Sequence, residues 1–328
     1  MKTKMIAAAG ILVLMIALLF AIRPKSFDKQ LANTMAEMDS YVLIGDMEIT
    51  KGEDIKSYAL EVGYKKQEKD LFRVSIVDKE LNQEQIILRN DAGVFVVTPS
   101  LNQIFKFEGN WPLNSPKPYL LQSIVEIAQK KEAKVEKEDD GYLVSSRVHY
   151  PNNKNFYREE IMFDKEAKVK WLQIYNKDDV AELKIAFMKV KYDAPIKDTY
   201  FDVPQTLDKK ASVSAIQEED LPLYPMTLHG AQLTNTSRMN INGKVKHVLE
   251  YSGDANFTVV QMKKDSVEKT QTVIMPGQMI DVLDMVGFYD GNHVSAIYDN
   301  VEFTVFSEDL SPDEMMSVIT SMQVAVMK

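Results

Sequence analysis

The stretch QIILRNDAGVFVVTPSLNQIFKFEGNWPLNSPKPYLLQSI, residues 85–124, decides how this chain is expected to fold. Its first half contains short runs of β-branched and aromatic residues separated by turn residues, which predicts strands between residues 84 and 109. Its second half carries three prolines between residues 112 and 118, followed by an apolar stripe with helical spacing over 118–130. Proline suits the first turn of a helix, where its missing N–H is not needed. The stretch therefore predicts three strands, a rigid crossing and a helix.

Alternation of apolar and polar residues extends outward from this stretch. In 57–66, for example, Tyr58, Leu60, Val62 and Tyr64 are predicted to face a core. The expected strands are 41–50, 57–66, 71–78, 84–90, 93–99, 104–109, 133–139, 141–150, 156–164, 168–176 and 181–193. A further helix is expected after Ser26 as its N-cap. A sheet of about eleven antiparallel strands is too wide to stay flat, so we expect a strongly curved sheet in an α+β unit.

The chain of 328 residues is long enough for two hydrophobic cores. Alternation is lost over 194–225, where proline and charge gather, and a second β-rich pattern follows that ends in a capped helix beginning at Ser311. The expected division is a membrane anchor or signal at 1–25, a first domain at 26–205, a linker at 206–222 and a small β-rich α+β domain at 223–328.

The N-terminus carries an apolar run without a charge, residues 5–22. This length just suffices to cross the hydrocarbon core as a helix. A cleaved signal peptide is the alternative, but no small-x-small site precedes Arg23, which favours an uncleaved anchor. Because the chain has no cysteine, a lipid anchor on cysteine is excluded. We expect a cell-membrane protein with a single N-terminal span and its bulk extracytoplasmic.

The sequence offers no support for catalysis or for nucleic-acid binding. The net charge of −9, with lysines interleaved among acids, argues against a nucleic-acid partner. The four histidines stand singly, and no zinc, serine-nucleophile or phosphate-binding motif occurs. Adjacent acids such as Glu159-Glu160 point to opposite faces of a strand and are interpreted as solvated surface. We expect no catalytic residue, no metal, no cofactor and no enzymatic activity.

Aromatic and aliphatic residues concentrate where the sheet is expected to meet the helix. The candidate hydrophobic mouth for a ligand consists of Phe105, Phe107, Trp111, Tyr119, Leu120 and Ile124. A sheet curved over a helix makes a concavity that suits an apolar ligand. Trp111 is expected to plug the junction, with its indole N–H bonded to a partner. In the alternative interpretation, which is the commoner outcome in proteins, these side chains simply fill the space between sheet and helices.

The block 85–124 also resembles a known family. An Arg-Asn-Asp turn, Gly-Val-Phe-Val-Val, Thr-Pro-Ser-Leu-Asn-Gln, Phe-Lys-Phe, Trp-Pro-x-Asn and Tyr-Leu-x-x-Ser are similar to sporulation-associated membrane lipoproteins of endospore-forming bacteria. Those proteins share the fold of the lipoprotein carrier LolA, in a superfamily that includes a clostridial germination lipoprotein and the envelope-stress regulator RseB. The resemblance covers about residues 26–205 and, more weakly, 221–328.

The resemblance implies a half-barrel sheet closed by helices, without enzymatic activity. It implies a lipid-like or lipoprotein ligand, or an envelope protein partner such as a cell-wall amidase, in sporulation or germination. The lipobox cysteine of the family is absent here, and a permanently anchored protein cannot shuttle between membranes. A stationary binding or scaffold role is therefore expected. An RseB-like sensor is one alternative, and an envelope-polymer hydrolase, suggested only by location and surface acids, is the other.

Overall fold

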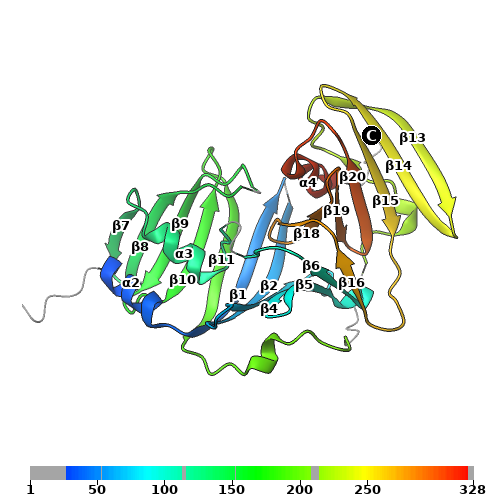
Figure 1. Ribbon diagram of the computed structural model, residues 1–328. Helices are drawn as coiled ribbons and strands as arrows, with labels where there is room; N and C mark the ends of the chain where they lie inside the picture. Colours follow the sequence, from blue (N-terminus) through cyan, green and yellow to red (C-terminus); the bar gives the residue numbers. More distant parts are fainter. Residues whose placement is uncertain (1–26, 53, 113–115, 152, 208–213, 324–328) are drawn as a thin grey trace, which may run out of the picture.

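The structure is a computed structural model that describes residues 27–323 except 53, 113–115, 152 and 208–213. The described chain is mostly β-structure, arranged as a twelve-stranded sheet, a seven-stranded sheet and a two-stranded pair, with few helices. Figure 1 shows the large sheet at one side of the molecule and the small sheet at the other. The expected anchor at 1–25 lies outside the described residues. Within those residues, no helix is long and apolar enough to span a membrane.

The large sheet contains eleven strands that correspond to the eleven expected. They are β1 (Ser40–Lys51), β2 (Asp54–Lys65), β3 (Leu71–Asp78), β4 (Gln83–Asn90), β5 (Gly93–Thr98), β6 (Gln103–Phe107), β7 (Lys134–Glu138), β8 (Gly141–Arg147), β9 (Arg158–Asp164), β10 (Val169–Tyr175) and β11 (Ala181–Tyr192). They pair antiparallel in the order β6-β5-β4-β3-β2-β1-β11-β10-β9-β8-β7. The chain thus runs outward from β1 to β6, crosses over, and returns from β7 to β11, which pairs with β1.

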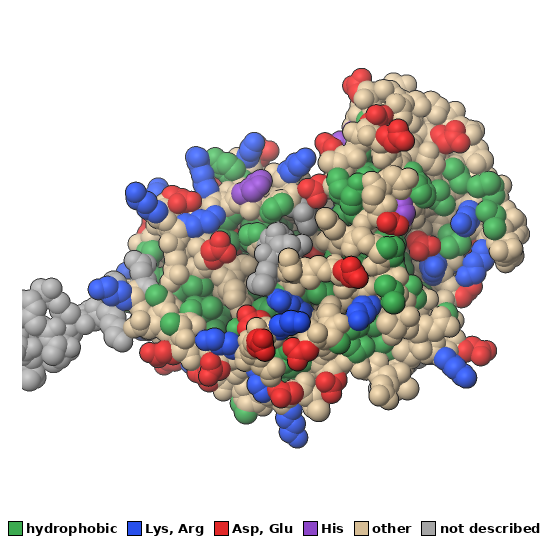
Figure 2. Space-filling model, in the orientation of Figure 1, with side chains coloured by type: hydrophobic (Ala, Val, Ile, Leu, Met, Phe, Trp, Pro, Cys, Tyr) green, Lys and Arg blue, Asp and Glu red, His purple; other side chains and the backbone are tan. Residues whose placement is uncertain are grey.

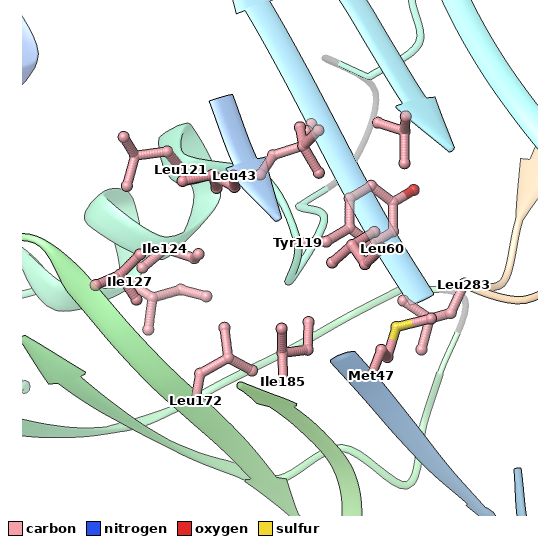
Figure 3. Close-up of a cluster of buried hydrophobic side chains, with 14 of the residues drawn as sticks. Leu43, Met47, Leu60, Tyr119, Leu121, Ile124, Ile127, Leu172, Ile185 and Leu283 are labelled. Atoms are coloured by element: carbon pink, nitrogen blue, oxygen red, sulfur yellow. The ribbon is translucent and has the colours of Figure 1, made fainter. Parts of the chain in front are cut away.

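Two helices, α2 (Phe27–Glu37) and α3 (Leu121–Ala128), pack on one face of this sheet. The helix α3 begins three residues later than its expected start at 118. Figure 3 shows the apolar face of α3 directed at inward side chains of the strands. The cluster drawn there includes Leu43, Met47, Leu60, Tyr119, Leu121, Ile124, Ile127, Leu172, Ile185 and Leu283. Burying each of these aliphatic side chains contributes about 1.5–3 kcal/mol, which explains why alternation in the strands specifies this face.

The segment 194–207, most of which was expected to belong to the first domain, crosses the opposite face of the large sheet as a strap. Its 3₁₀ turn η2 (Asp198–Phe201) buries Phe201, and Val203 and Leu207 pack on an outer cluster of β4, β5 and β6 side chains. Tyr200 lies over Gly63 in β2, where a Cβ atom would come within 2.5 Å of the tyrosine ring. The Tyr200 hydroxyl donates to Glu61 at 2.6 Å. Gly63 is therefore required for the close approach of the strap.

The chain after the strap, which we call the C-terminal part, builds the small sheet. The chain up to and including the strap is the other of the two parts. Its strands are β13 (Ala231–Ile241), β14 (Lys244–Gly253), β15 (Phe257–Lys263), β17 (Gln278–Asp281), β18 (Val286–Tyr289), β19 (His293–Tyr298) and β20 (Val301–Phe306), in the order β13-β14-β15-β20-β19-β18-β17. The helix α4 (Pro312–Thr320) packs on β19 and β20, and Ser311 caps it with Glu314, as the sequence predicts. A turn η3 (Glu218–Asp220) precedes the short strand β12 (Tyr224–Pro225), which pairs with β21 (Met322–Gln323).

One strand of the C-terminal part belongs to the large sheet. β16 (Gln271–Met275) pairs with β6 in parallel, from Gln271 opposite Gln103 to Met275 opposite Phe107. The connection is reinforced at Asn102, whose Nδ2 donates to the carbonyl of Val267 at 3.0 Å and whose Oδ1 accepts from the Thr270 hydroxyl at 2.6 Å. The sheet was expected to be antiparallel throughout, and it instead has one parallel edge. Alternation identified β16 as a strand but carries no information about which strand it pairs with.

Candidate functional site

The six predicted mouth residues lie on the helix-covered face of the large sheet, and Phe107, Trp111 and Tyr119 among them contact the C-terminal part. Two belong to β6, Trp111 lies in the proline-rich crossing, two immediately precede α3, and Ile124 lies in α3. All except Phe105 are buried, and Phe105 is half-buried. Only 2% of Trp111 is exposed, and its ring meets Phe72 edge-on with centroids 6.1 Å apart. The structure therefore brings the six residues together inside a hydrophobic core.

The partner expected for the Trp111 indole is Asp281, the last residue of β17. Trp111 Nε1 donates to Asp281 Oδ2 at 2.9 Å, and the Tyr119 hydroxyl donates to the same oxygen at 2.6 Å. The backbone N–H of Leu283 donates to Oδ1 at 3.0 Å. Burial, reinforced by the Asp281 charge, raises the pKa of Tyr119 well above its ordinary value. We refer to Trp111, Tyr119 and Asp281 as the aspartate clasp.

A second buried carboxylate joins the two parts a few residues further on. Asp284 accepts from Lys51 Nζ at 2.7 Å and from the Tyr58 hydroxyl at 2.8 Å, and only 2% of its side chain is exposed. Burial alone would raise the pKa of Asp284, yet the Lys51 ammonium and the two hydrogen bonds hold that pKa below its ordinary value. Asp284 therefore stays charged and ties the ends of β1 and β2 to the β17–β18 loop.

Polar contacts continue along the junction between β2–β6 and β19–β20. Lys56 hydrogen-bonds the Tyr298 hydroxyl, and its ammonium lies 4.2 Å from the centre of that ring. Gln83 Nε2 donates to Asp299 Oδ1 at 2.9 Å. Ser100 and Asn300 are joined by a bond of 2.9 Å. Together with β16 and the aspartate clasp, these contacts hold the two parts in one fixed arrangement.

The hollows beside the six residues are small or partly polar. Phe105 and Phe107 line a space of about 20 Å³ together with Phe288 of β18. Such a space holds at most a single water molecule. Phe107 and Trp111 also line a hollow of about 250 Å³, whose walls include Glu108, Asn110 and Gln278. In the structure, the principal neighbour of the predicted mouth is thus the segment 278–288 of the same chain.

A larger cleft of about 530 Å³ lies between the two parts. The outline of the molecule in Figure 2 is indented between them. The β1–β2 turn, the loop around residues 151–155, the β17–β18 loop and α4 form its walls. Apolar lining comes from Ile49, Pro151, Met226, Val282, Leu283 and Met316. Polar lining comes from Lys51, Lys154, Glu182, His229, Asp313 and Glu314. Polar and apolar groups therefore share this surface, which the sequence patterns did not reveal.

Glu159 in β9 was interpreted as a solvated surface acid, and that interpretation is wrong. Its side chain is fully buried, and Oε2 accepts from the Tyr150 hydroxyl at 2.7 Å. Burial raises the pKa of Glu159 to about 8. Within the described residues, Oε1 has no hydrogen-bond partner. Its neighbour Glu160 points to the opposite face and pairs with Arg158, so the two acids do diverge as a strand requires.

No group of three or more His, Cys, Asp or Glu side chains in the described ranges could hold a metal ion.

No family model matches the chain. The chain is 28% identical to the sporulation protein YdcC of Bacillus subtilis (strain 168) over 294 residues. This alignment covers 88% of this chain and 86% of that protein. The chain is a homologue of this sporulation protein. The predicted relationship to sporulation proteins of endospore-forming bacteria is thus confirmed.

Solved structures show a weaker likeness. MucB is 13% identical with a TM-score of 0.34, over 92% of this chain and 99% of that chain. The MucA/MucB complex of Pseudomonas aeruginosa is 12% identical in sequence with a TM-score of 0.32, over 92% of this chain and 98% of that chain. A putative outer membrane lipoprotein-sorting domain from Vibrio parahaemolyticus is 8% identical in sequence with a TM-score of 0.31, over 53% of this chain and 95% of that chain. Scores of this size carry no argument about function.

Proposed function

We propose that this chain is a non-enzymatic, membrane-tethered scaffold outside the cytoplasm that binds a protein partner during sporulation. The cleft between α4 and the β1–β2 turn is the proposed binding site. One observation carries the proposal: the helix-covered face of the large sheet is filled by the chain's own side chains, whereas the cleft of about 530 Å³ is open. The sporulation relative supports the setting, and the apolar run at 5–22 supports the tether.

The lining of the cleft favours a protein segment over an acyl chain. Sites for apolar ligands are lined mainly by hydrophobic groups with few polar ones. Here charged side chains from both parts, including Lys154, Glu182 and Asp313, alternate with apolar groups such as Met226 and Met316. A polypeptide segment offers both kinds of group, together with backbone donors and acceptors. A site of mixed character therefore suits a peptide better than a hydrocarbon.

The fixed junction between the two parts favours a stationary role. The aspartate clasp and the Asp284 contacts bury charged groups between them, and breaking such contacts one partner at a time is costly. A rigid, anchored surface can present the same cleft continuously. Binding of a lipid-like group at the predicted mouth remains a proposal too, and it requires segment 278–288 to leave Phe107 and Trp111.

Photo-crosslinking from the cleft tests the proposed function. A photoreactive amino acid replaces Met226, which is 66% exposed and lines the cleft. The matched control replaces Met188, which is 69% exposed on β11 and lies outside the cleft lining. In membranes of sporulating cells, the expected result is a discrete protein adduct from position 226 that is absent at position 188.

Two results would contradict this function. Equal labelling from both positions, or none from either, would remove the support for a partner in the cleft. If the full-length protein then bound a fluorescent acyl probe, the ligand-mouth interpretation would replace it. The mass of the crosslinked protein would also separate an envelope enzyme, such as a cell-wall amidase, from a regulatory partner of an RseB-like sensor.

A further inference from the structure

The strand β13 is an unprotected edge of the small sheet. Within the described residues it pairs only with β14 and stands at the end of the strand order. Figure 1 shows β13 and β14 as the outermost pair of strands at the right of the molecule. Alternate N–H and C=O groups of an edge strand point away from the sheet and can pair with another chain. β13 therefore offers eleven residues of backbone to a partner.

Edge strands are commonly protected by charges, by proline or by short length. The strands β7, β16 and β17 also end a sheet, and β7 has four charged residues among five, all of them exposed. β13 has no proline, and Arg238 is its sole charged residue among eleven. Its side chains are nevertheless almost all exposed, and Leu233, Met239 and Ile241 are 43%, 44% and 44% exposed. A long, nearly uncharged strand with exposed aliphatic side chains has the features of a binding edge.

The charge around this edge indicates what kind of segment would bind. Residues 221–249 contain no acid, although the whole chain has 48 acids and a net charge of −9. Lys244 and Lys246 of β14 lie directly opposite Ile241 and Met239, so each of these two exposed aliphatic residues has a lysine beside it on the same face. Arg238, Lys244 and Lys246 make no ion pair with any residue that the structure describes.

We propose that β13 binds an extended, acidic segment of a protein partner, which adds to the small sheet as a further strand. Main-chain hydrogen bonds along β13 supply affinity, and the acidic residues of the segment lie on the face that carries Met239, Ile241, Lys244 and Lys246. Lys244 and Lys246 attract these acidic residues, whereas the aliphatic residues of the segment lie on the opposite face of the sheet. This inference deepens the proposed scaffold function by naming a second surface, separate from the cleft, and the kind of segment that it recognises.

Synthetic peptides test this surface on the full-length chain in nanodiscs of neutral phosphatidylcholine. The probe is a fluorescent nine-residue peptide in which glutamate alternates with valine or threonine. One control peptide has lysine for every glutamate, and a second has proline at central positions, which removes N–H donors. The acidic peptide is expected to bind, with an affinity that falls as salt rises, and both controls are expected to bind at least about tenfold more weakly.

Variants of the chain locate the binding. The double variant Met239→Asp and Ile241→Asp changes two exposed side chains and places like charges opposite the acidic peptide. It is expected to weaken binding about tenfold, because each like-charge pair across a ladder opposes pairing. The control Met188→Asp changes a still more exposed methionine on β11 and is expected to leave binding unchanged. Circular dichroism of each variant verifies that the sheet is intact.

The proposal is overturned if the acidic peptide does not bind, if the lysine peptide binds equally well, or if the double variant binds it unchanged. It is also overturned if binding of phosphatidylglycerol vesicles depends on Met239 and Ile241 and binding of the peptide does not. The edge would then contact an anionic membrane. Failure here leaves a crosslink from Met226 in the cleft unaffected. Conversely, peptide binding without a crosslink from Met226 would support β13 as a binding edge and argue against the cleft as a binding site.

Discussion

Replacing Asp281 by alanine is expected to destabilise the whole molecule, because this side chain lies at the centre of the junction. In the wild type, Asp281 accepts hydrogen bonds from the Trp111 indole and the Tyr119 hydroxyl. Trp111 is 2% exposed and Tyr119 is completely buried, so water cannot replace the missing acceptor. Alanine therefore leaves two buried side-chain donors, and the backbone N–H of Leu283, without the carboxylate.

The size of the effect follows from the number of donors left without the carboxylate. A buried donor that loses its partner costs about 1–3 kcal/mol, so the two side-chain donors alone cost about 2–6 kcal/mol. A change of this size is a large fraction of the stability of a typical protein. The Asp290→Ala variant is a matched control, because Asp290 is an exposed aspartate nine residues further on. We expect that control to change the free energy of unfolding by less than about 0.5 kcal/mol.

Urea unfolding of the full-length protein in a non-ionic detergent, followed by tryptophan fluorescence, measures this free energy. The chain has two tryptophans, so a Trp171→Phe background makes Trp111 the sole reporter. A double-mutant cycle with Tyr119→Phe isolates one bond of the clasp. Tyr119→Phe is expected to cost about 1.5–3 kcal/mol in the wild type, and to recover stability beside Asp281→Ala, because it then removes a donor that has lost its acceptor.

The clasp would be refuted as a source of stability by either of two results. One is an Asp281→Ala variant no less stable than Asp290→Ala. The other is equal costs of Tyr119→Phe with and without Asp281, since two side chains that do not interact give additive effects.

Two further predictions concern the interior of the large sheet. Because Glu159 has a pKa of about 8 when folded, against an ordinary value of 4.5, the folded state retains a proton that the unfolded state loses as pH rises from about 4.5 to 8. The free energy of unfolding should fall by about 3–5 kcal/mol over this range, and Glu159→Gln should abolish the fall. If the free energies of unfolding of variant and wild type changed with pH in parallel, this prediction would be contradicted. Gly63→Ala should cost about 1–3 kcal/mol through contact with Tyr200, measured by the same unfolding assay. Adding Tyr200→Ala should relieve most of that cost, and an unchanged cost would exclude the contact as its cause.

The sequence predicts the large sheet well because each of its long strands has one face in the core. Tyr58, Leu60, Val62 and Tyr64 alternate along β2, and all four are buried as expected. The short strands β17 and β18 have four residues each, which are too few to show a period of two. Local patterns thus specify the element type wherever the element is long.

The contacts between distant segments could not be predicted in this way. The sequence implied that the Trp111 indole needs a partner, yet nothing local to Asp281 marks it as that partner from 170 residues away. The parallel pairing of β16 with β6 is likewise a relation between segments and not a property of either one. Glu159 resembled a surface acid because an adjacent pair of acids is usually solvated, and only the packing around β9 shows that it is not.

The pairing of β16 with β6 has a consequence for the order in which the chain can fold. Until residues 271–275 have been synthesised, the outer backbone of β6 has no strand beside it. Proteins fold largely from the N-terminus during synthesis, and open strand edges in that interval promote aggregation. The large sheet is therefore completed only after most of the small sheet's residues have emerged. A chain that terminates after the strap at residue 207 would present β6 as a permanently open edge.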